Sequence, residues 1–138
     1  MRVTSYLNFD GRCEEAIEFY KKEVGATVSM LMRFKDNPQP PTKDCGVPPG
    51  MENKIMHSSL TIGDSMVMLS DGHAKNQPKF EGVSLAMATA TDADAKRIFE
   101  GLSQGGKVTM PMTKTFFSSN FGMLVDKFGI SWMVMVRG

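Results

Sequence analysis

The sequence predicts an α+β fold made of two tandem β-α-β-β-β modules, and two observations predict it. Residues 3–72 show a strand pattern, an amphipathic helix pattern and three further strand patterns, and residues 83–136 repeat that order. The repetition is also visible in the letters, since GATVSM (25–30) and GGKVTM (105–110) each follow a helix pattern and begin a strand pattern. One supersecondary unit used twice accounts for both observations. We therefore expect a single domain over residues 1–138, with modules at about 1–72 and about 80–138.

The first module begins with alternating apolar and polar residues in VTSYLNF (3–9), which predicts a strand. Apolar residues recur at helical spacing in CEEAIEFYKKEV (13–24), with charges on the other face, and this predicts a helix. The further strand patterns are ATVSMLMRF (26–34), IMHSSLTI (55–62) and SMVMLS (65–70). Gly63 and Asp64 predict a hairpin between the last two strands, because both residue types tolerate the left-handed turn conformation. Residues 36–53 contain five prolines and two glycines, which predicts a long surface loop.

The second module contains a predicted helix, DADAKRIFEGL (92–102), with Asp92 as its expected N-cap. Its strand patterns are VSLAMATA (83–90), KVTMPM (107–112), FGMLV (121–125) and ISWMVMV (130–136). Asp126 begins a tight turn before the last strand, and turn formation is its expected role. Trp132 alternates with Ser131 and Met133, so we expect it to pack against the helix as core.

Composition excludes several classes of function. The 16 Lys and Arg residues balance 15 Asp and Glu residues without a run of one sign, which disfavours nucleic acid and anionic membranes as partners. No apolar run reaches the about 18 residues of a membrane span, and the N-terminus is too polar for a signal peptide. We therefore expect a cytoplasmic protein. Cys13 and Cys45 lack metal-type spacing, and in a reducing compartment they are expected to be free thiols.

Four segments resemble the PhnB-like branch of the glyoxalase, bleomycin resistance and extradiol dioxygenase superfamily, which is also called the vicinal oxygen chelate superfamily. The segments are YLNFDG (6–11), EEAIEFY (14–20), GDSMVMLSD (63–71) and FGMLVDKFGISWMV (121–134). The resemblance implies a curved sheet with a cleft shared by the two modules, a homodimer and an unknown small-molecule ligand. This branch often carries the label 3-demethylubiquinone-9 3-methyltransferase-like. The sequence has no Gly-rich turn between a strand and a helix to support that label, so we expect no cofactor.

Metal-dependent members of the superfamily carry His or Glu on the first and last strands of each module. The resemblance places the corresponding positions at Ser5, Met68, Val83 and Met133, and a shift of one residue on the fourth strand would give Val67 or Leu69. Zinc, nickel and iron prefer imidazole, carboxylate or thiolate ligands. These four positions therefore predict a metal-free cleft, without the glyoxalase or dioxygenase chemistry of the metal-dependent members.

The two histidines are the remaining candidates for chemistry. His57 shares the more polar face of its strand with Ser59 and Thr61. It is either a hydrogen-bonding or proton-transferring group in the cleft, or a half-buried side chain satisfied by a neighbouring strand, and the second interpretation is favoured. His73 is expected to be a solvated loop residue.

The predicted cleft combines these positions with aromatic and thioether side chains. We expect it to be lined by Ser5, Leu7, His57, Ser59, Met68, Ser70, Val83, Phe116, Phe117 and Met133. Phe116 and Phe117 would close over a ligand, or else plug the edge of the module. The chain has 13 methionines, which would suit a cleft for varied apolar ligands, although ordinary core packing explains most of them.

The sequence thus predicts a PhnB-like protein of unknown specific activity that binds a small molecule. One alternative is an enzyme with displaced catalytic groups, in which His57 is the general base and Ser5 or Ser70 assists. Another is sequestration of a planar drug, as in bleomycin-resistance proteins, but the near-neutral net charge gives no sign of an acidic cleft for a cationic drug. Replacing His57 by Ala separates the enzyme from the binding protein, because a general base cannot be removed without loss of turnover.

Overall fold

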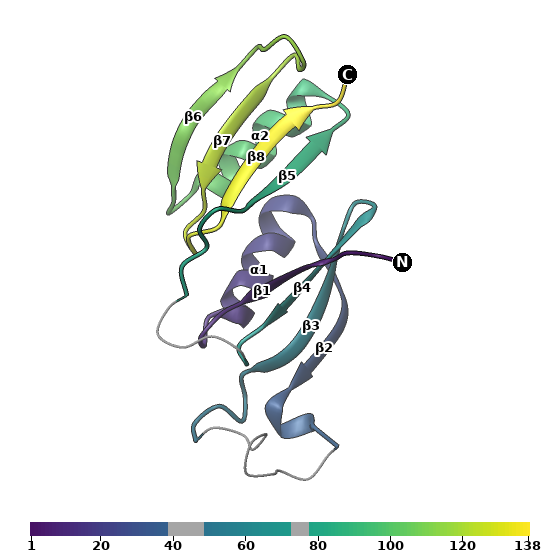
Figure 1. Cartoon of the computed structure of the whole chain (residues 1–138), viewed down its shortest axis with the longest axis vertical. Helices are drawn as coiled ribbons and strands as arrows, with labels where there is room; N and C mark the ends of the chain where they lie inside the picture. Colours follow the sequence, from purple (N-terminus) through teal and green to yellow (C-terminus); the bar gives the residue numbers. More distant parts are fainter. Residues whose placement is uncertain (39–48, 73–77) are drawn as a thin grey trace. The chain divides into compact units, whose positions relative to one another are not determined.

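The computed structural model describes residues 1–38, 49–72 and 78–138, and these divide into two units, Met1–Pro78 and Lys79–Gly138 (Figure 1). Each unit contains one four-stranded mixed sheet and one long helix. In both units the order along the chain is β-α-β-β-β, with one additional 3-10 turn in the first. The predicted α+β fold with two such modules is therefore confirmed.

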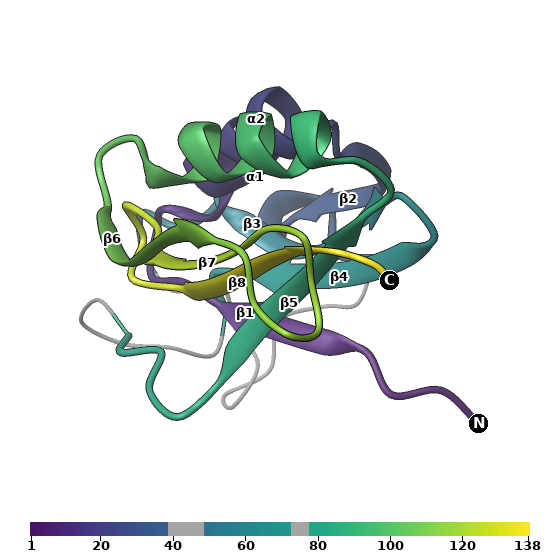
Figure 2. The same ribbon diagram turned by 90° about the horizontal axis from the view of Figure 1, so that it is seen from above.

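The first unit has its sheet in the order β1-β4-β3-β2. Its elements are β1 (Ser5–Asn8), α1 (Cys13–Val24), β2 (Thr27–Arg33), the 3-10 turn η1 (Phe34–Asp36), β3 (Ile55–Ile62) and β4 (Ser65–Ser70). β1 is parallel to β4, and the other neighbouring strands are antiparallel. The helix α1 runs along one face of this sheet, as Figures 1 and 2 show.

Helix α1 forms because its apolar residues return to one face every three or four positions. Cys13, Ala16, Ile17 and Tyr20 are buried, while the acidic residues of the first turn and the basic residues of the last turn suit the helix dipole. The helix ends at Gly25, whose φ of 70° is the left-handed conformation that glycine adopts without strain. The buried face of α1 thereby covers the sheet side that carries Leu7, Leu60 and Leu69.

The second unit repeats the topology with its sheet in the order β5-β8-β7-β6. Its elements are β5 (Ser84–Thr89), α2 (Asp92–Ser103), β6 (Lys107–Thr113), β7 (Phe121–Val125) and β8 (Ser131–Val136). The N-cap of α2 is Thr91, whose Oγ1 accepts a hydrogen bond of 3.1 Å from the backbone N–H of Asp94. The prediction of Asp92 as the N-cap was therefore wrong by one residue, since Asp92 is already helical.

The core of the second unit confirms two local predictions from the sequence. Trp132 is 3 % exposed and belongs to the core. Asp126 organises the turn before β8, because its Oδ1 accepts hydrogen bonds from the backbone N–H groups of Phe128 and Ile130 at 2.9 and 3.1 Å. Its Oδ2 accepts a bond of 2.9 Å from Nε1 of Trp132, so the same carboxylate also fixes the indole.

The remaining predictions for single residues differ in outcome. Cys13 is a buried free thiol. Cys45 and His73 lie outside the residues that the structure describes. No helix within the described ranges is long and apolar enough to cross a membrane.

Candidate binding face of the first sheet

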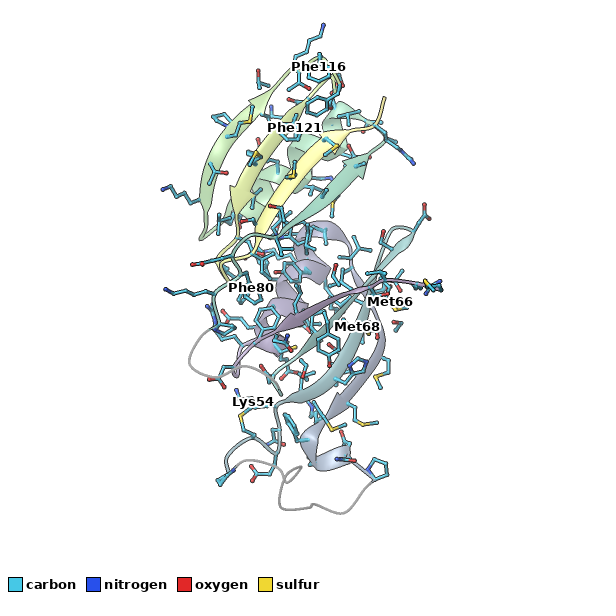
Figure 3. The ribbon with its side chains drawn as sticks, in the orientation of Figure 1. Lys54, Met66, Met68, Phe80, Phe116 and Phe121 are labelled. Carbon is cyan, nitrogen blue, oxygen red and sulfur yellow. The ribbon has the colours of Figure 1, made fainter. Side chains whose placement is uncertain are left out.

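The face of the first sheet that points away from α1 collects the principal candidate residues. The strand register places Met68 beside Tyr6 on one side and Ser59 on the other, Met30 beside Ser59, and His57 beside Met32. Because neighbouring residues of adjacent strands share a face, these side chains form one surface. We call it the bare face, and it comprises Tyr6, Asn8, Met30, Met32, His57, Ser59, Met66 and Met68. Figure 3 labels Met66 and Met68 on it.

Tyr6 and His57 form the polar centre of the bare face. Oη of Tyr6 lies 3.0 Å from Nδ1 of His57, and the two rings stack with centroids 5.6 Å apart and planes inclined by 26°. In the described part of the chain, Nε2 of His57 has no hydrogen-bond partner. With the imidazole proton on Nε2, the tyrosine hydroxyl donates to Nδ1 and the Nε2–H group remains as a donor.

Asn8 adds an acceptor to this face. Its Oδ1 is buried and, among the described residues, makes no hydrogen bond. A buried polar atom without a partner costs about 1–3 kcal/mol, so a donor from water or from a ligand would stabilise this site. Tyr6 and Asn8 alternate with Leu7 on β1 and thus lie on the same side of the sheet.

The structure brings only some of the predicted cleft residues of this unit together. His57, Ser59 and Met68 lie on the bare face. Ser5 and Leu7 lie on the opposite side of β1, where Leu7 is 8 % exposed and adjoins Leu69.

Ser70 is fully buried and its hydroxyl is engaged by the backbone. It donates to the carbonyl of Met56 at 2.7 Å and accepts from the N–H of Gly72 at 2.8 Å. Its hydroxyl therefore stabilises the end of β4. Gly72, which follows, packs close to Phe34, and a Cβ added at Gly72 would lie 3.2 Å from the Phe34 ring.

Tyr6 was not among the residues predicted from the sequence, although a signal for it was present. The family resemblance places the first-strand position at Ser5. Alternation in VTSYLNF places Tyr6 on the other face from Ser5 and Leu7, and a shift of one residue moves every side chain of a strand to the opposite face. The contact with His57 crosses over β4, and pattern alone cannot show such a contact.

The predicted cleft residues of the second unit are spread over its sheet and loops. Val83 is 68 % exposed and precedes β5. Met133 is half-buried and lies on the face of β8 opposite to Trp132. Phe116 and Phe117 lie between β6 and β7. Phe116, labelled in Figure 3, is fully exposed. Phe117 packs edge-on against Phe121 with ring centroids 5.1 Å apart.

The four strand positions that the family resemblance relates to metal ligands do not have side chains suited to zinc, nickel or iron. Ser5, Met68, Val83 and Met133 supply one hydroxyl, two thioethers and one hydrocarbon side chain. These ions prefer imidazole, carboxylate and thiolate ligands. Within residues 1–38, 49–72 and 78–138, no three His, Cys, Asp or Glu side chains cluster as a metal site.

The start of α1 is likewise unsuited to the phosphate of a nucleotide-type cofactor. The Asp71 carboxylate already accepts hydrogen bonds there, from the N–H groups of Gly11 at 2.7 Å and Cys13 at 3.1 Å. A dinucleotide cofactor binds through its phosphates at such a helix start, and a carboxylate at the same N–H groups repels it. Burial, with a further contribution from Asp71, raises the pKa of the Cys13 thiol well above its usual range, which disfavours a nucleophilic thiolate.

Comparisons with known proteins agree with this fold. Residues 1–135 match the family model described as 3-demethylubiquinone-9 3-methyltransferase. Protein YjdN of Escherichia coli strain K12 is 32 % identical over 142 residues, which cover 99 % of this chain and 95 % of YjdN. Protein PA1353 of Pseudomonas aeruginosa is 35 % identical, with a TM-score of 0.84 and coverage of 99 % of this chain and 98 % of PA1353.

Two further structures extend the likeness. A putative 3-demethylubiquinone-9 3-methyltransferase, PhnB protein, from Bacillus cereus is 27 % identical, with a TM-score of 0.80 and coverage of 99 % of this chain and 100 % of the other. A glyoxylase/bleomycin resistance protein/dioxygenase domain from Frankia sp. EAN1pec shares the fold, with a TM-score of 0.69, 12 % identity and coverage of 100 % and 92 %. The chain therefore belongs to the PhnB-type 3-demethylubiquinone-9 3-methyltransferase family, whose fold is that of the glyoxalase/bleomycin resistance/dioxygenase superfamily.

Proposed function

We propose that the chain binds a small molecule with an apolar body and one hydrogen-bonding group on the bare face of the first sheet. The Tyr6–His57 pair is the observation that carries this proposal. It places a hydroxyl and an imidazole side by side on a surface that is otherwise rich in thioethers. Ligand sites have this composition, with a mainly apolar lining and a few polar groups that fix orientation.

The methionines suit an apolar ligand of irregular shape. Met30 and Met66 are 40 % and 37 % exposed, and Met68 is half-buried between Tyr6 and Ser59. Thioether side chains are flexible and polarisable, and they make favourable contacts with aromatic rings. This surface would therefore accept a ring or an alkyl group in more than one orientation.

The polar groups define the rest of the ligand. Nε2 of His57 would donate to a ligand carbonyl or accept from a ligand hydroxyl, depending on its tautomer. Methyl transfer is not part of the proposal, because Asp71 already occupies the start of α1.

A thermal-shift screen with a metabolite library would identify ligands, because a molecule that binds the native state raises its stability. Affinities of the hits would then be measured by calorimetry for the wild type and for Tyr6→Phe and His57→Phe. We expect each variant to bind about fivefold more weakly, since a net hydrogen bond contributes about 1 kcal/mol. The matched control is Ser5→Ala, which removes a hydroxyl from the adjacent residue on the other side of β1.

Two results would contradict the proposal. One is a screen without any hit. The other is a ligand whose affinity is unchanged in Tyr6→Phe and His57→Phe but reduced in Ser5→Ala.

We also propose that the chain is a homodimer, which rests on the family resemblance. Light scattering of the purified chain at several concentrations tests this directly. A mass twice that of one chain is expected, and a single-chain mass at all concentrations would exclude it.

A further inference from the structure

The second unit has a pocket on the side of its sheet that α2 covers, between α2 and strands β6 and β7. Its volume is about 480 Å³, which is within the range of small-molecule sites. Phe99, Pro111 and Met112 provide apolar lining, and Lys96, Glu100 and Asn120 provide polar groups. The bare face belongs to the other unit, and the two surfaces have no residue in common.

The floor of the pocket is closely packed. A Cβ added at Gly122 would lie 2.6 Å from Sδ of Met112 and 2.7 Å from Cε2 of Phe99, so only glycine lets these two side chains approach β7. The register of β6 shifts on both sides of Met110, and bulges of this kind bend and twist an edge strand. Pro111 is tolerated within this irregular edge, where no ladder hydrogen bond is required of it.

The charges at the pocket are not engaged by the protein. Lys96 and Glu100 are one helical turn apart, with Lys on the N-terminal side, which is the less favourable order for an ion pair on a helix. Among the described residues, neither side chain forms an ion pair or a hydrogen bond, and the same is true of the Asn120 amide group. On the same helix, Asp94 and Arg97 do pair, at 3.1 Å.

An apolar floor flanked by one cation, one anion and one amide is complementary to a particular kind of molecule. A ligand with only one charge would pair with one of the two charged side chains and leave the other, which has the same sign as the ligand, unmatched beside it. An α-amino acid has an ammonium group and a carboxylate group bonded to the same carbon atom. It can therefore pair with Glu100 and Lys96 together, because side chains one turn apart are about 5–6 Å from each other at Cβ.

We propose that this pocket binds an apolar α-amino acid. Its ammonium group pairs with Glu100, and its carboxylate pairs with Lys96 and accepts from the amide of Asn120. Its side chain lies on Phe99 and Met112. Both charged residues are exposed, so each ion pair contributes modestly and the affinity depends on both acting together.

The test is an NMR titration of the full chain with L-phenylalanine, 3-phenylpropanoate and 2-phenylethylamine, which share one ring and differ in their charges. We expect saturable shifts at Phe99, Met112 and Asn120 with L-phenylalanine, and about two- to fivefold weaker binding of each singly charged analogue.

Substitutions then assign the two charges. Glu100→Gln should weaken L-phenylalanine without weakening 3-phenylpropanoate, and Lys96→Met should weaken L-phenylalanine without weakening 2-phenylethylamine. Asp94→Asn and Arg97→Met are the matched controls, because they remove the same two charges from the same helix outside the pocket, and they should leave binding unchanged.

The proposal is overturned if L-phenylalanine causes no saturable shifts at its solubility limit, or if both analogues bind as tightly as the amino acid. It is also overturned if Glu100→Gln and Lys96→Met have no more effect than the controls. Because none of these variants lies on the bare face, failure here would leave the proposed function untouched, and the reverse also holds.

Discussion

The two helices start in different ways, although their units share one topology. Helix α2 begins with a local N-cap, in which the Thr91 hydroxyl accepts from the N–H of Asp94. Helix α1 has Arg12 at the N-cap position, without a side-chain capping bond. Its first turn is instead held by Asp71, from the end of β4, which bonds the N–H groups of Gly11 and Cys13.

This difference shows that the N–H groups at a helix start can be bonded by a residue near in the sequence or by one far from it. The first N–H groups of any helix lack partners within the helix and must be satisfied by something. Thr91 satisfies one of them three residues away, and its effect stays within α2. Asp71 is 2 % exposed and also accepts from the N–H of Ile55 at 3.1 Å, so it joins the start of α1 to β3 and to the end of β4.

Asp71→Ala should therefore lower the free energy of unfolding most, because it removes the hydrogen bonds that join the start of α1 to β3 and the end of β4. The change removes the acceptor of three backbone N–H groups, and two of these hydrogen bonds are buried. Each buried N–H group without a partner lowers the free energy of unfolding by about 1–3 kcal/mol. We expect the free energy of unfolding in urea to fall by at least about 3 kcal/mol. The matched control is Asp64→Ala at the exposed hairpin, which should cost less than about 1 kcal/mol. Equal losses in the two variants would show that Asp71 has no special role.

Asp126→Asn is the corresponding change in the second unit. Asp126 is also a buried carboxylate, but it bonds the N–H groups of a turn and not those of a helix start. The amide can accept from either the turn N–H groups or the Trp132 indole, but not from both as the carboxylate does. We expect a loss of about 2 kcal/mol. Trp132 is the only tryptophan, so its fluorescence reports the change directly.

A double-mutant cycle with Trp132→Phe isolates the bond from the indole to the carboxylate. A coupling energy near zero would mean that the indole bond does not contribute. Loss of helical circular dichroism in Asp126→Asn without a change at Trp132 would contradict its assignment to the turn.

Thr91→Ala tests the local cap and should have a smaller effect than either aspartate change. Loss of an N-cap hydroxyl costs about 1 kcal/mol, and Thr91→Ser should restore most of it. Arg12→Ala is the matched change at the same position of α1, and we expect it to cost less than about 0.5 kcal/mol because no capping bond is lost. Urea unfolding of the three variants measures the difference. A larger loss in Arg12→Ala than in Thr91→Ala would reverse the comparison.

The smallest expected effect concerns a second distant contact of α1, between Glu14 and Arg33 at the end of β2. The hydrogen bond from Arg33 lowers the pKa of the Glu14 carboxyl. This contribution is therefore present above the usual carboxyl pKa and is lost as the pH falls through the lowered value. Because Glu14 is 54 % exposed, solvent screens the pair, and we expect no more than about 0.5 kcal/mol.

Unfolding in urea at about pH 7 and about pH 3, for the wild type and Glu14→Gln, measures this contribution. The stability difference between the two proteins should be largest at neutral pH and should decrease in acid. Glu15→Gln, which removes a neighbouring carboxylate that pairs with Arg12, is the control. A difference that grows in acid would refute the assignment.

Periodicity in the sequence predicted the elements of the fold because it reports which face of each element is apolar. The alternation in IMHSSLTI and SMVMLS gave β3 and β4, and the Gly63-Asp64 pair gave their hairpin, in which Gly63 has a φ of 57°. The turn at Asp126 and the burial of Trp132 also followed from local pattern. The N-cap of α2 was missed by one residue, since Thr91 and Asp92 are both capping residue types and only the backbone conformation distinguishes them.

The sequence by itself determined two β-α-β-β-β units, their buried faces and their family, because helix and strand periods are local properties. Only the tertiary structure decided which side chains meet across strands. The Tyr6–His57 pair spans 51 positions in sequence and the Asp71 bond to Gly11 spans 60, and both depend on the parallel register of β1 on β4. No local pattern encodes such a register, because it results from packing the whole sheet against its helix.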